Sequence, residues 1–72
     1  MGELEVIADG IRRVLGPETE VRGDMRLDHL GLDSFDVLEL ASDLDARGLV
    51  LDLERLAPYP TVADLVGVCR EA

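Results

Sequence analysis

Apolar residues in this chain recur three or four positions apart, and this spacing constrains the fold more than any other feature of the sequence. The spacing is that of a helix with one buried face. In residues 3–15 it is set by Leu4, Ile7, Ala8, Ile11, Val14 and Leu15. It returns in later segments separated by Gly, Pro and Asp. We therefore expect an all-α fold: a small four-helix bundle of three main helices and one short third helix, at about residues 3–15, 34–47, 52–57 and 61–70.

The residues between these segments indicate where the helices begin and end. Gly16 and Pro17 stop the first helix, since glycine suits a helix C-terminus and proline cannot continue one. Asp33 and Thr61 are N-cap residues, each followed three positions later by an aspartate, as in a capping box. A long first loop, residues 17–32, is unusual in so small a domain and often functional. Residues 49–51 resemble a strand but are too short to pair, so we expect no sheet.

Size and charge limit the classes of function. Seventy-two residues make one domain, whose core is marginal because so short a chain buries only about 60% of its unfolded surface. Seven Arg against 16 acidic residues give a net charge of −9. This charge argues against binding nucleic acid or anionic lipid and favours partners with basic surfaces. We expect a monomer, and we expect a binding or carrier module rather than an enzyme.

The chemistry-bearing residues exclude several kinds of site. Cys69 is the only cysteine and His29 the only histidine, so neither an intrachain disulfide nor a metal site of Cys and His ligands is expected. No Ser–His–Asp or Cys–His arrangement supports a nucleophile. The first ten residues lack the basic and apolar pattern of a signal peptide, and no apolar run approaches the roughly 20 residues of a spanning helix. We expect a cytoplasmic protein without a membrane anchor.

The second helix, residues 34–47, has two different faces when about 100° is taken per residue. Its core face is expected to hold Val37, Leu40, Ala41 and Leu44. The opposite face carries Phe35, Leu38 and Ser42. Acids surround them at Asp33, Asp36, Glu39, Asp43 and Asp45. One interpretation is an ordinary solvated face; the other is a docking surface with an apolar centre and acids that steer a basic partner.

Ser34 stands at the start of this helix, directly after Gly31-Leu32-Asp33. Taken alone, a serine there is a capping or first-turn residue. The run LDHLGLDSFDVLEL, residues 27–40, nevertheless resembles the attachment motif of acyl carrier proteins and their peptidyl-carrier relatives. That motif is Asp-Ser-Leu with a glycine just upstream, and here Phe35 replaces the leucine. The order of the helices and the Pro-Thr-Val-x-x-Leu sequence at residues 60–65 also resemble this family.

The resemblance implies that a phosphopantetheinyl transferase moves 4′-phosphopantetheine from coenzyme A onto Ser34. The arm's thiol would then carry acyl or aminoacyl groups as thioesters, in fatty acid, polyketide or nonribosomal peptide biosynthesis. Asp33 and Ser34 match the motif, and Asp36, Leu38 and Glu39 match positions that family members use to meet partner enzymes. The helix face adds Phe35, Ser42 and Asp43 to the expected docking residues.

Two hypotheses follow for the function. The first is a non-catalytic carrier served by the transferase and by loading and synthase enzymes with basic docking surfaces. The second is an unmodified module of the same fold that docks on a basic protein. The Asp33-Ser34 pair at the helix start favours the first. Met1 and the complete helix pattern favour a free-standing protein.

Overall fold

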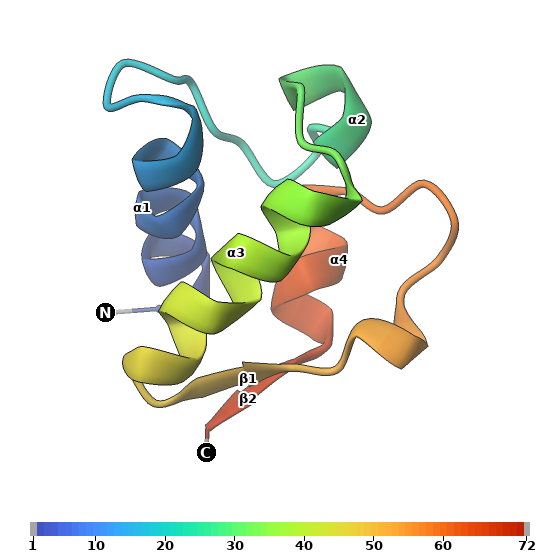
Figure 1. Cartoon of the computed structure of the whole chain (residues 1–72). Helices are drawn as coiled ribbons and strands as arrows, with labels where there is room; N and C mark the ends of the chain where they lie inside the picture. The colour runs from blue at the N-terminus through green and yellow to red at the C-terminus, as the bar shows by residue number, and fades with distance from the viewer. Residues whose placement is uncertain (1, 72) are drawn as a thin grey trace.

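The computed structural model describes residues 2–71 as a small helical domain with four α-helices and a short two-stranded sheet. In chain order the elements are α1 (Glu3–Leu15), α2 (Leu27–Leu30), α3 (Ser34–Ala46), β1 (Leu49–Leu51), the 3-10 helix η1 (Leu53–Arg55), α4 (Val62–Gly67) and β2 (Cys69–Glu71). Helix α1 packs against both α3 and α4. Figure 1 shows α2 beside the beginning of α3. The two strands lie near the C-terminal end of α3 (Figure 1).

Three helices supply the centre of the core. Its fully buried side chains are Ile7 and Ile11 from α1, Leu40 and Leu44 from α3, and Val62 and Leu65 from α4. Each contributes roughly 1.5–3 kcal/mol by leaving water. The core face predicted for the second helix is confirmed, since Val37 and Ala41 also pack against this cluster as partly buried residues.

Helices α1 and α3 approach closely because Gly10 has no side chain. A Cβ atom at Gly10 would lie 2.6 Å from Cδ1 of the fully buried Leu40. The glycine therefore lets the backbone of α1 lie against the core side chains of α3.

Both predicted capping boxes are present. At the start of α3, the Asp36 amide donates to Asp33 Oδ1 at 2.8 Å, and the Asp33 amide donates to Asp36 Oδ2 at 3.3 Å. The same exchange joins Thr61 and Asp64 at the start of α4. These contacts satisfy amide groups that the helix itself leaves free.

The small domain of four helices expected from the sequence is present, but the expectation that it contains no sheet is wrong. Strands β1 and β2 pair antiparallel, with Leu51 opposite Cys69 and Leu49 opposite Glu71. The fourth helix, expected to reach residue 70, accordingly ends at Gly67. The sequence did not indicate this sheet because the three residues of β1 are too few to show the alternation of a strand, and their partner strand lies some twenty positions away. Cys69 therefore lies in a strand, half-buried against the core, and burial raises the pKa of its thiol.

The expected first loop and third helix also differ from the structure. The loop contains α2, and backbone hydrogen bonds tie it to the chain before α4, from Leu27 N to Pro60 O (3.0 Å) and from Val62 N to Met25 O (2.9 Å). The third segment is only the 3-10 helix η1, whose N-cap Asp52 makes no side-chain capping bond. A segment of three or four residues is too short to show a helical period, so its conformation is set by tertiary contacts.

No helix within residues 2–71 has the length and apolarity needed to cross a bilayer.

Candidate functional site

Ser34 is held in an exposed position at the first residue of α3. Just before it, Gly31 ends α2 with a φ of +94°, a left-handed conformation that favours glycine. Leu32 then turns into the core, with its amide bonded to Leu27 O at 3.0 Å. Asp33 supplies the capping oxygen, so Ser34 is not the capping residue. Its hydroxyl is presented to solvent by a rigid turn.

An apolar groove lies beside Ser34. Its volume is about 400 Å³, and Ser34 is one of the residues that line it. Helix α3 contributes Val37 and Leu38, and the chain between β1 and α4 contributes Leu53, Leu56 and Tyr59. The groove forms only when these two distant segments fold together.

Tyr59, like Leu53 and Leu56, lines this site although the sequence analysis did not predict it. Its only signal in the sequence is an aromatic residue between two prolines. The Arg26 guanidinium carbon lies 4.8 Å from the centre of the Tyr59 ring, a cation–π contact. Arg26 is itself held by Asp28, with Nε donating to Oδ1 at 3.0 Å, and this hydrogen bond lowers the pKa of Asp28 below its ordinary value.

Most of the predicted docking residues lie on the surface of α3 that faces solvent. Phe35 and Leu38 are 68% and 58% exposed, although they are large apolar side chains. Glu39 and Ser42 are exposed, and Asp36 is half-buried in the capping box. The structure thus brings the first two turns of α3 together with Ser34 as one mixed apolar and acidic surface.

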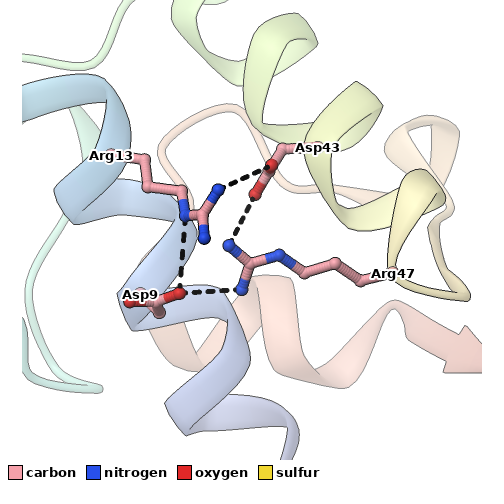
Figure 2. Close-up of polar contacts among 4 residues, drawn as sticks. All are labelled: Asp9, Arg13, Asp43 and Arg47. Atoms are coloured by element: carbon pink, nitrogen blue, oxygen red, sulfur yellow. Dashed lines mark hydrogen bonds and ion pairs between the residues drawn. The ribbon is translucent and has the colours of Figure 1, made fainter.

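Asp43 differs from the other predicted docking residues because it belongs to a cluster of ion pairs between α1 and α3. Figure 2 shows Asp9, Arg13, Asp43 and Arg47 in this cluster. Arg47 Nη1 lies 2.8 Å from Asp9 Oδ2, and Arg47 Nη2 lies 3.3 Å from Asp43 Oδ2. Arg13 contacts the same two carboxylates at 3.6 and 3.9 Å. The Asp43 side chain is only 29% exposed.

The ion-pair cluster affects both charge and titration. Its two arginines balance its two aspartates, so it adds little to the negative field of α3. The hydrogen bond from Arg47 lowers the pKa of Asp9 below its ordinary value, with further electrostatic contributions from Arg47, Arg13 and Arg12. The cluster joins the helices at the far end of α3 from Ser34.

The described residues offer little catalytic chemistry near this surface. His29 is exposed on α2, four residues before Asp33 along the chain. Within residues 2–71, no group of three or more His, Cys, Asp or Glu side chains is arranged to hold a metal ion. What the site does present is the exposed Ser34 beside an apolar groove.

Comparison with known proteins identifies the family. The sequence model of the family described as phosphopantetheine attachment site matches residues 5–69 of this chain. The chain is 40% identical over 60 residues to the siderophore peptide synthetase fer3 of Mycosarcoma maydis, covering 82% of this chain and 1% of that protein. It is 38% identical over 53 residues to the pseudomonine synthase PmsE of Pseudomonas entomophila, covering 74% of this chain and 9% of that protein. No solved structure matches at comparable significance.

The chain therefore belongs to the phosphopantetheine attachment-site family. Domains of this family hold 4′-phosphopantetheine covalently and are generally carriers without catalytic activity. The predicted resemblance to carrier proteins is confirmed. The chain spans only a small part of both synthetases.

The geometry around Ser34 fits such a group. The hydroxyl is exposed, as attachment by another enzyme requires. A phosphodiester there would face the N-terminus of a 13-residue helix, whose free amides and dipole favour negative charge. The carboxylates of Asp33 and Asp36 would oppose this attraction, so the helix end would not hold the phosphate tightly. The groove offers apolar surface within the same site.

Proposed function

We propose that Ser34 is the attachment residue and that the chain carries acyl or aminoacyl groups for partner enzymes of a peptide synthetase pathway. The observation that carries this proposal is the exposed Ser34 hydroxyl at the first residue of α3, with its capping role taken by Asp33. The family supports the cofactor. The similarity to a siderophore peptide synthetase favours peptide synthesis over fatty acid or polyketide synthesis.

The chain's own residues have a limited part in the attachment. Ser34 Oγ forms a new bond to the phosphorus of coenzyme A that bears the pantetheine. The bond from that phosphorus to the adenosine bisphosphate portion breaks, and the serine proton passes to a base on the transferase. Asp33 Oδ1 and Asp36 Oδ2 accept the hydrogen bonds of the capping box, and neither residue has the role of base in this scheme. When bound, the arm supplies a thiol that holds cargo as a thioester.

The rigid turn before α3 has a clear role in this scheme. Leu32 and the capping box hold the backbone on both sides of Ser34, so a transferase meets this residue on a backbone of one conformation. This arrangement reduces the entropy lost when the two proteins form a productive complex.

Intact-protein mass tests the proposal. The purified chain is incubated with coenzyme A and a broad-specificity phosphopantetheinyl transferase. We expect the parent to gain the mass of one arm and Ser34→Ala to gain none while remaining folded. Ser42→Ala is the matched control, because Ser42 is the only other serine and lies on the same helix; its final mass should include the arm. A parent chain that gains no mass would favour the unmodified docking module instead.

A further inference from the structure

Large apolar side chains are exposed unevenly over the surface. Within residues 2–71 the exposed ones are Leu4, Phe35, Leu38 and Tyr59. Three of the four belong to the site: Leu38 and Tyr59 line the groove together with Ser34, and Phe35 follows Ser34 on α3. A domain with so small a core gains no stability by leaving these groups in water. Exposed apolar groups gathered around one site mark a contact surface.

Tyr59 is held in place although it is 69% exposed. Arg26 lies over its ring, and Asp28 fixes Arg26 from the other side. The backbone bridge between Arg26 and Thr61 keeps the two chain segments together. A tyrosine that is ordered before binding loses little entropy when a partner covers it, and tyrosine is among the residues that dominate binding interfaces.

Two unpaired carboxylates lie near the same end of α3, and another, the exposed Asp45, lies near its other end. Within residues 2–71, no ion pair involves Asp36 or Glu39. Asp43, by contrast, is paired with Arg13 and Arg47. Asp36 and Glu39 can therefore attract a basic partner to the first two turns of α3, beside Ser34, whereas the charge of Asp43 is already balanced.

We propose that Tyr59 is a docking residue for the phosphopantetheinyl transferase, which closes across the groove onto Phe35, Leu38 and Tyr59. The transferase's cations face Asp36 and Glu39, and its contact does not extend along α3 to Asp43. Arg26 is a positioning residue that acts through the Tyr59 ring. This inference rests on the proposed attachment at Ser34.

Steady-state loading with coenzyme A and a broad-specificity transferase tests the role of Tyr59. We expect Tyr59→Ala to lower kcat/KM at least about tenfold, mainly through a higher KM, as truncation of an interface anchor does. Tyr59→Phe keeps the ring and should restore the parent value to within about twofold. Leu4→Ala is the matched control: it also removes an exposed apolar side chain, but from α1, and should load like the parent.

A double substitution tests the positioning role of Arg26. Arg26→Gln removes the cation from the ring of Tyr59, and we expect a reduction in kcat/KM that is smaller than that of Tyr59→Ala. In the Tyr59→Ala background the same change should have no further effect, because Arg26 acts through the ring. Thermal unfolding of each variant shows whether it remains folded.

The possible outcomes separate this inference from the proposed function. If the parent gains no arm, both fail. If the parent is loaded at Ser34 and Tyr59→Ala is loaded equally fast, only the docking role is overturned. If Tyr59→Phe is loaded as slowly as Tyr59→Ala, the proposed apolar contact of the Tyr59 ring with the transferase is overturned. A further outcome is that Tyr59→Ala and the parent are loaded at equal rates, while the NMR signals of the backbone amides that line the groove shift only after loading. That outcome would show that the arm, not the transferase, occupies the groove.

Discussion

Two leucines on α3 should differ greatly in how much the same truncation destabilises the fold. Leu44 is fully buried among the core side chains, whereas Leu38 is 58% exposed. Leu44→Ala removes buried methyl groups and leaves a cavity, which costs about 2–5 kcal/mol. Leu38→Ala removes contacts mainly with water and should change the free energy of unfolding by no more than about 0.5 kcal/mol.

The magnitude of the Leu44 effect is large for this domain. A chain of this length has a total stability on the order of 4–11 kcal/mol, so the substitution removes a substantial fraction. A loss of only about 2 kcal/mol lowers the Tm by roughly 8 °C or more in a domain of this size.

Urea unfolding followed by circular dichroism measures both variants against the parent. We expect the midpoint of Leu44→Ala to fall sharply, with Leu38→Ala close to the parent. Equal destabilisation by the two substitutions would refute the assignment of one face of α3 to the core and the other to partners.

Three further predictions concern charge and packing. Glu39→Lys should slow association with the transferase several-fold at low salt and less at high salt, since exposed charges are screened; an unchanged rate at low salt would mean that the acidic face is only solvated. Because Arg47 lowers the pKa of Asp9, that contact stabilises the fold above the ordinary pKa of 3.8 and is lost as the pH falls through the lowered value. Asp9→Asn should therefore lose less stability than the parent on acidification; equal losses would contradict this. Gly10→Ala should destabilise despite alanine's better helix propensity, because the new methyl group would lie 2.6 Å from Cδ1 of Leu40, which is fully buried among core side chains; a higher Tm would contradict this.

The parts of the fold that depend on local pattern were predictable. The first helix has the predicted bounds, and the capping boxes at Asp33 and Thr61 are formed as the residue spacing indicated. The buried positions Leu40 and Leu44 followed from the period of α3 alone. In each case the deciding residues lie within about one turn of each other.

The parts that depend on distant contacts were not predictable in this way. Strand β1 becomes a strand because residues 69–71 pair with it, and the sequence near Leu49 contains no sign of that partner. Tyr59 joins the site only because the chain before α4 folds against α2 and α3. The period of α3 placed Asp43 among its acids, but the pairing of Asp43 with Arg13 comes from a different helix.

The most direct test of the central claim is the position of the arm on the loaded chain. The parent is incubated with coenzyme A and the transferase, digested, and its peptides are sequenced by mass spectrometry. The account predicts one added 4′-phosphopantetheine, located on Ser34. An arm on any other residue, or no arm under conditions that load a known carrier protein, would contradict it.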